Sequence, residues 1–97
     1  MIKYRIYTED INRNDVLCLL NRYFQGYTIL SASGVWLGVS EASIVIEYIT
    51  ESENIDYTDL KIQQVCNEIK ILNKQQDILY TREDIVGVLI SDDTYFR

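Results

Sequence analysis

The residues best suited to recognising a ligand lie in one short stretch, residues 34–41. The stretch holds the only tryptophan and two of the four glycines, together with a hydroxyl and a carboxylate: Gly34, Trp36, Gly38, Ser40 and Glu41. A tryptophan offers a flat surface on which a heteroaromatic ring can stack. A carboxylate and a hydroxyl can bind ribose hydroxyls or an amino group. Because glycine permits positive φ and close backbone approach, the pattern predicts a ligand-binding hairpin tip.

A purely structural interpretation of these residues stays open. Trp36 could cover an edge of the core or a neighbouring subunit, and Glu41 could bind backbone N–H groups of its own hairpin. The glycines do not form a phosphate-binding loop, because neither glycine-rich phosphate motif follows a strand and opens a helix here. If the ligand carries a phosphate, Arg5 and Arg82 are the predicted contacts.

The composition excludes several kinds of active site. The chain has no histidine, which removes His-based general bases, Ser-His and Cys-His nucleophile pairs and the usual zinc sites. The two cysteines, Cys18 and Cys66, have no metal-type spacing and are predicted to be reduced core residues. We therefore predict no catalytic residue, no metal and no cofactor, and we favour a binding protein over an enzyme.

Size and charge narrow the class of partner. At 97 residues the chain is predicted to be a single domain, residues 1–97. Its 9 basic and 15 acidic residues give a net charge of -6, which opposes direct binding of nucleic acid. No apolar run approaches the roughly 20 residues of a membrane span, and no signal peptide is evident. We expect a cytoplasmic protein, in the host cytoplasm if it is phage-encoded, with no membrane partner.

Hydrophobic periodicity predicts six elements in the order strand, helix, strand, strand, helix, strand. They fall at residues 2–7, 14–24, 27–33, 43–50, 60–73 and 76–81. This α+β order is the ferredoxin-like βαββαβ motif, whose right-handed crossovers give an antiparallel sheet of order 4-1-3-2 with both helices on one face. An apolar run at 86–90 predicts an extra C-terminal strand or a packed extension, and 91–97 is predicted to be a loose tail.

The sheet face away from the helices is predicted to be an interface. It carries Tyr7, Val45 and Ile49, with Arg5 and Glu47 positioned to pair among them. Two helices can cover only one face of a four-stranded sheet, so these apolar side chains would face water in a monomer. The pattern therefore predicts a homo-oligomer.

In its hairpin and element order, the chain resembles the PII-like and CutA-like branch of ferredoxin-like proteins over about residues 2–81. It also resembles small phage and bacterial proteins with the hairpin motif Gly-x-Trp-x-Gly-x-x-Glu, here Gly34, Trp36, Gly38 and Glu41, and more distantly phage S-adenosylmethionine lyases. The resemblance implies a homo-oligomer, a trimer before a dimer, with sheet faces inward and small ligands in clefts between subunits. The hairpin is too short for a PII-type loop, so ATP and 2-oxoglutarate sensing are not implied.

Three functions fit the sequence. The favoured one is a phage-type anti-defence protein that sequesters a small nucleotide-like ligand at subunit clefts. The second is an anti-CRISPR-like acidic inhibitor that blocks a host defence protein, a nucleic-acid-binding effector, by direct contact. The third is a lyase acting on a nucleotide-type cofactor such as S-adenosylmethionine. Sequence alone does not separate them, since one scaffold can host all three.

Overall fold

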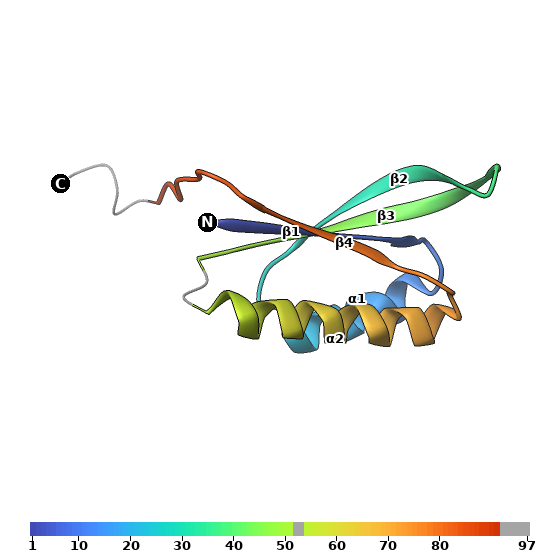
Figure 1. Ribbon diagram of the computed structural model, residues 1–97, viewed down its shortest axis with the longest axis horizontal. Coiled ribbons are helices and arrows are strands. Elements are labelled where there is room, and N and C mark those ends of the chain that lie inside the picture. The colour runs from blue at the N-terminus through green and yellow to red at the C-terminus, as the bar shows by residue number, and fades with distance from the viewer. Residues whose placement is uncertain (52–53, 92–97) are drawn as a thin grey trace.

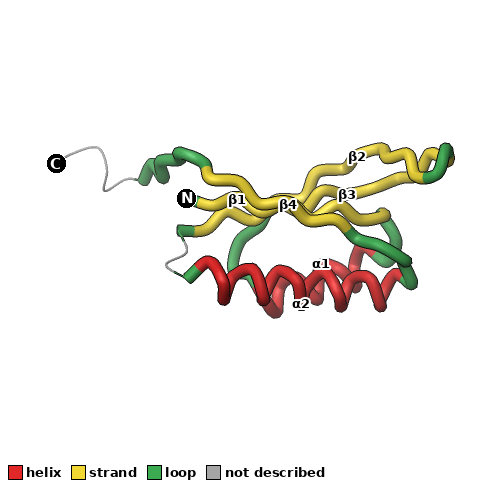
Figure 2. Tube along the Cα trace, viewed as in Figure 1, coloured by secondary structure: helices red, strands yellow, loops and turns green. Residues whose placement is uncertain are grey.

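The structure, a computed structural model, describes residues 1–51 and 54–91 and confirms the predicted βαββαβ order. The elements are β1 (Ile2–Glu9), α1 (Arg13–Tyr23), β2 (Thr28–Trp36), β3 (Val39–Thr50), α2 (Ile55–Asn73) and β4 (Leu79–Asp84). The strands form one antiparallel sheet in the order β2-β3-β1-β4, which is the predicted order, and both helices lie against the same face of it (Figures 1 and 2). The fold is therefore ferredoxin-like.

Strand alternation explains which side chains form the core. The residues of β1 and β3 that face the helices are apolar and buried, and they pack against one stripe of each helix. The core comprises Ile2, Tyr4, Ile6, Val16, Leu19, Leu20, Phe24, Ile44, Ile46, Ile62, Val65, Cys66 and Ile69. Each large side chain in this layer stabilises the fold by about 1.5–3 kcal/mol relative to exposure. Cys66 has the predicted core position, but Cys18 does not: it lies on the outer side of α1 and is exposed.

Among the element boundaries that differ from the sequence prediction, the starts of α2 and β4 are set by polar side chains. Helix α2 begins at Ile55, five residues before the predicted start, since the Asn54 side chain caps it by accepting a hydrogen bond from the Tyr57 N–H at 3.0 Å. Strand β4 begins three residues later than predicted. The preceding connection is held by Gln75, which accepts a hydrogen bond from the Thr8 hydroxyl at 2.5 Å and donates one to the Asp77 carbonyl at 3.2 Å.

The hairpin between β2 and β3 is longer and its turn tighter than predicted. Trp36 is the last residue of β2 and pairs with Val39, so it lies in a strand rather than in a loop. Only Leu37 and Gly38 turn the chain, with φ of 50° and 78°, the positive angles that two-residue type I′ turns require. Because β1 ends opposite Ser43, the tip of the hairpin extends beyond the rest of the sheet (Figure 1).

The C-terminal region does not add a strand. Its described part, residues 85–91, has no regular secondary structure, so the extra strand over 86–90 is not formed within the chain. The loose tail predicted over 91–97 lies outside the described residues except for Ser91. Among the described residues, no helix is both long and apolar enough to cross a membrane.

Candidate functional site

The hairpin brings an aromatic ring and a carboxylate together on one face of the sheet. Gly34 pairs with Glu41 and Trp36 pairs with Val39, so alternation puts Gly34, Trp36 and Glu41 on the same side. This side, which faces away from the helices, is called the open face. Trp36 is 54% exposed there, while Glu41 is half-buried. Trp36 is therefore available to a ligand beside a partly desolvated carboxylate.

Gly34 leaves a gap between these two side chains. A Cβ at this position would lie 3.5 Å from the Ser43 hydroxyl and 3.8 Å from Glu41 Cγ, which are ordinary contact distances. Neither sterics nor a positive φ therefore demands glycine here. The absence of a side chain exposes backbone between the indole and the carboxylate, so a ligand can approach closely.

Glu9, a residue that the sequence analysis missed, adds a second carboxylate. It ends β1 opposite Ser43, one row along the open face from Glu41. Burial raises the pKa of Glu41, and the nearby negative charge of Glu9 raises it further. We call Glu9, Gly34, Trp36 and Glu41 the hairpin cluster. A carboxylate, Glu41, near an exposed indole, with a second carboxylate, Glu9, farther along the same face, suits a ligand that combines a flat ring with an amino or cationic group.

The remaining predicted ligand contacts lie elsewhere in the chain. Ser40 pairs with Val35, so it lies on the opposite face of the hairpin from Glu41. Arg82 pairs with Tyr4, and Tyr4 pairs with Tyr48 on β3. Tyr48 is nine residues along β3 from Val39, the partner of Trp36. At the rise of a strand this is about 30 Å. Arg5 is only one row closer, so neither arginine meets the hairpin cluster within one chain.

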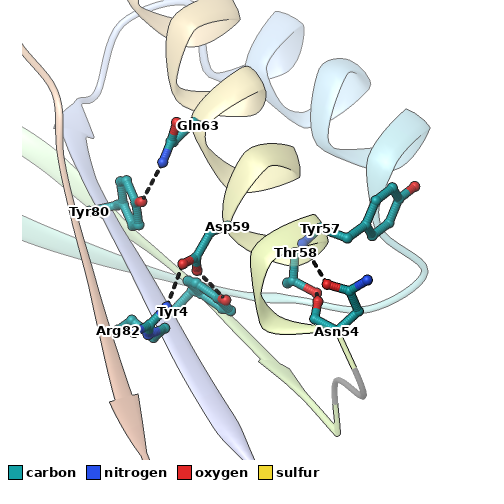
Figure 3. Close-up of polar contacts among 8 residues, drawn as sticks. All are labelled: Tyr4, Asn54, Tyr57, Thr58, Asp59, Gln63, Tyr80 and Arg82. Atoms are coloured by element: carbon teal, nitrogen blue, oxygen red, sulfur yellow. Dashed lines mark hydrogen bonds and ion pairs between the residues drawn. The ribbon is translucent and has the colours of Figure 1, made fainter.

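Both arginines are already paired. Figure 3 shows Arg82 in an ion pair with Asp59 on α2, while the Tyr4 hydroxyl donates a hydrogen bond to the other oxygen of Asp59 at 2.6 Å. Burial raises the pKa of Tyr4, and Asp59 raises it further. Arg5 contacts Glu47 at 2.9 Å, the pairing expected from the sequence. These contacts tie strands and helix together and leave the arginines partly neutralised.

The centre of the open face carries a continuous apolar row across all four strands. Its members are paired in register: Leu79, Tyr7, Val45 and Leu30. Tyr7, Leu30 and Leu79 are exposed. Figure 2 shows no helix or strand over this side of the sheet. Ile49, also exposed, lies beyond the Arg5–Glu47 pair. Leu30 and Leu79 both lie within strands that the sequence predicted, at 27–33 and 76–81, so strand alternation could have placed them on this face.

The larger of the two described hollows lies elsewhere, on the outer side of the helices. It has a volume of about 640 Å³ and is lined by Asp15, Cys18, Leu19, Arg22, Glu68, Ile71 and Leu72. It is an open groove edged by charged side chains, with no convergent polar set to orient a ligand. Within the described ranges, no three His, Cys, Asp or Glu side chains are grouped as a metal site requires. The hairpin cluster remains the better candidate.

The sequence matches no protein-family model and no curated protein sequence. The structure is similar to a phage SAM lyase in the apo state, with a TM-score of 0.71 and 20% identity over 84% of this chain and 78% of that one. It is also similar to a phage SAM lyase in complex with S-methyl-5'-thioadenosine, with a TM-score of 0.70 and 18% identity over 86% of this chain and 80% of that one. A third similar structure is CPII, a nitrogen regulatory PII-like protein from Thiomonas intermedia K12 bound to ADP, AMP and bicarbonate. Its TM-score is 0.60, with 22% identity over 92% of this chain and 94% of that one. These similarities confirm the predicted resemblance at the level of the fold.

Proposed function

We propose that the hairpin cluster binds a small nucleoside-type ligand. The observation that carries this proposal is the exposed indole of Trp36 on the open face, next to the bare backbone of Gly34 and the half-buried Glu41. Trp36 stacks on the base, and Glu41 binds ribose hydroxyls or an amino group. The ligands named for two structures of similar fold, S-methyl-5'-thioadenosine and ADP with AMP, support a ligand of this class.

The other predicted residues have different parts in this proposal. Gly38 holds the tight turn that positions Trp36, since its φ of 78° favours glycine. Ser40 lies on the far face of the hairpin, so it contacts only a ligand that reaches around the tip. Arg5 and Arg82 lie too far from Trp36 in their own chain, and they contact a phosphate only if a second subunit brings them to the hairpin.

We propose that the protein is a homo-oligomer that buries the open face. Tyr7, Val45 and Ile49 are the apolar part of the contact, and the Arg5–Glu47 pair provides its polar part. An exposed apolar row across a whole sheet is typical of an interaction surface. A closed trimer, favoured over a dimer by the PII-like resemblance, would form clefts between subunits in which ligand and arginine meet.

In this account the protein sequesters its ligand in the cytoplasm, as a phage-type anti-defence protein that withdraws a small molecule from the host. A second candidate function is a lyase that cleaves S-adenosylmethionine, favoured specifically by the fold shared with phage SAM lyases. Of the hairpin cluster, Glu41 is the group whose raised pKa fits a role in proton transfer or charge stabilisation.

Mass spectrometry of small molecules released by denaturing the purified protein tests the proposal. We expect a nucleoside-type compound from the wild type and much less from Trp36→Ala. Incubation with S-adenosylmethionine then separates the two candidates, because a lyase releases S-methyl-5'-thioadenosine with turnover and a sequestering protein releases the ligand unchanged. If no nucleoside co-purifies and none of S-adenosylmethionine, AMP and ADP binds, the proposal fails, and inhibition of a host protein becomes the leading hypothesis.

A further inference from the structure

One edge of the sheet lacks the features that normally keep an edge strand from pairing. The outer edge of β2 has no strand beside it, since β3 is its sole partner in the described sheet. Its nine residues, Thr28–Trp36, include no charged residue and no proline. The opposite edge differs, because β4 carries Arg82, Glu83 and Asp84 among its six residues. Charged side chains protect an edge from strand addition, so β4 is protected and β2 is not.

The chain also contains a segment with the properties of a strand but without a partner strand. Residues 85–90, which we call the tail, are uncharged and rich in β-branched residues. Val86, Val88 and Leu89 are 99%, 75% and 82% exposed. The Ile85 N–H donates to the Met1 carbonyl at 2.9 Å, and beyond it no backbone hydrogen bond joins 86–90 to another described residue. The tail therefore exposes both apolar side chains and backbone polar groups.

The tail cannot reach the free edge of its own β2 around the hairpin. It leaves the sheet where Asp84 pairs with Ile2, at the end opposite the hairpin tip (Figure 1). Ile2 in turn pairs with Thr50, which lies eleven residues along β3 from the partner of Trp36. This separation is about 36 Å at the rise of a strand. The tail continues β4, so strands β1 and β3 also lie between it and β2.

We propose that the tail of one copy adds as a strand to the β2 edge of a second copy. The β2 edge is uncharged and has unpaired backbone groups, and the tail is an uncharged segment whose own backbone groups lack a partner strand, so the two can pair. Because donor and acceptor lie on different surfaces of the chain, the contact is head-to-tail, and a closed ring of copies is the arrangement in which every tail has an edge to pair with. The neighbour's tail then lies along β2, which ends at Trp36, and forms one wall of the hairpin cluster.

Hydrogen–deuterium exchange of the full-length, ligand-free protein, with Val88→Pro and Val88→Thr, tests this inference. Proline removes a backbone donor in the tail, whereas threonine keeps the donor and the branched shape. In the wild type and Val88→Thr we expect slow exchange in the tail and at the outward-facing amides of β2. In Val88→Pro we expect both to lose protection, together with a fall in mass by light scattering. Since Val88 lies far from β2 in its own chain, a loss of amide protection at β2 reports contact with a second copy.

Fast exchange of residues 85–90 in the wild type overturns the inference, as does a Val88→Pro variant that leaves β2 protected and the mass unchanged. A protected tail in a monomeric protein also overturns it, because the tail then docks on its own chain. Binding of S-methyl-5'-thioadenosine, measured in parallel, separates this inference from the proposed function. Ligand binding with an unprotected tail rejects only strand addition, and a protected tail without binding rejects only the proposed ligand.

Discussion

At the scale of residues, Glu41 should make ligand binding depend on pH. Its pKa is raised by burial and by Glu9, so its negative charge is lost at a higher pH than for an ordinary glutamate. A cationic ligand such as S-adenosylmethionine needs the ionised form. Its affinity should therefore be full above the raised pKa and fall as the pH drops through it. Calorimetric titration across pH should show this fall in affinity for the wild type. Glu41→Gln should bind more weakly and should not show the fall. Equal profiles for both proteins would remove Glu41 from the site.

The two cysteines should react very differently with an alkylating reagent. Cys18 is exposed, whereas burial of Cys66 raises the pKa of its thiol to about 12 and keeps reagent away. Intact-mass analysis with iodoacetamide and no reductant should show one modification on the folded protein and two after unfolding. Two modifications on the folded protein would mean that the α2 side of the core is open, and none after unfolding would mean that the cysteines are disulfide-bonded.

The types of the site residues were predictable, but their grouping was not. A lone tryptophan between glycines identified the hairpin as a recognition element. Which side chains share a face depends on strand register, and a shift of one residue inverts every assignment. Ser40 and Glu41 were therefore grouped although they lie on opposite faces, and Glu9 was missed because the end of β1 was assigned to a turn.

At the scale of elements, Asp59 connects α2 to the sheet. Its carboxylate accepts the hydrogen bond of the fully buried Tyr4 hydroxyl and pairs with Arg82. Asp59→Ala should lower the free energy of unfolding by about 1–3 kcal/mol, since it leaves the Tyr4 hydroxyl without its acceptor. Chemical denaturation measures the loss, and the cost should shrink when Tyr4→Phe is already present.

The matched control for Asp59 is Glu83→Ala. Glu83 forms an ion pair with Lys3 at 2.8 Å, but its side chain is largely exposed. Exposed pairs contribute at most about 1 kcal/mol, so this change should leave stability nearly unaltered. Equal losses in the free energy of unfolding for Asp59→Ala and Glu83→Ala would show that the hydrogen bond from Tyr4 to Asp59 does not stabilise the fold.

The elements themselves were largely predictable, because period-2 and helical patterns alternate clearly along the chain. The errors occurred where polar side chains or turn geometry decide a boundary. Asn54 capped α2 earlier than the apolar stripe indicated, and Gly34 was taken for loop although it lies within β2. Glycine lowers strand propensity but does not prevent pairing, and here the β-branched and aromatic neighbours continue the ladder to Trp36.

At the scale of the whole molecule, the open face should control assembly. Ile49 is exposed on this face, and a charge there would have to be buried in an oligomer. Ile49→Asp should therefore dissociate the assembly in light scattering at micromolar concentration. The control is Ile71→Asp, on the exposed outer side of α2, which should leave the mass unchanged. A monomeric wild type would remove the cleft between subunits and favour an inhibitor whose open face meets a different protein.

Assembly is the level that sequence patterns describe least well. The uncovered sheet face followed from the apolar character of β3 on both sides, but for the apolar run at 86–90 the sequence left open an extra strand or a packed extension. A strand pattern reports the need for a partner edge and does not identify the chain that supplies it. In the proposed assembly the edge that receives the tail belongs to β2, which two strands, β1 and β3, separate from the tail's own β4.

The most direct test of the account is titration with S-methyl-5'-thioadenosine, followed by calorimetry and by the fluorescence of the single tryptophan. Because Trp36 is the only tryptophan, a change in its emission reports contact at the hairpin. We expect saturable binding with altered emission. Trp36→Ala should weaken binding by about 1–3 kcal/mol, roughly 5- to 150-fold, with little change in melting temperature. Tyr57→Ala, which removes an exposed aromatic on α2, should bind like the wild type. Unchanged affinity in Trp36→Ala, together with a large fall in melting temperature, would contradict the account and show that Trp36 only supports the fold.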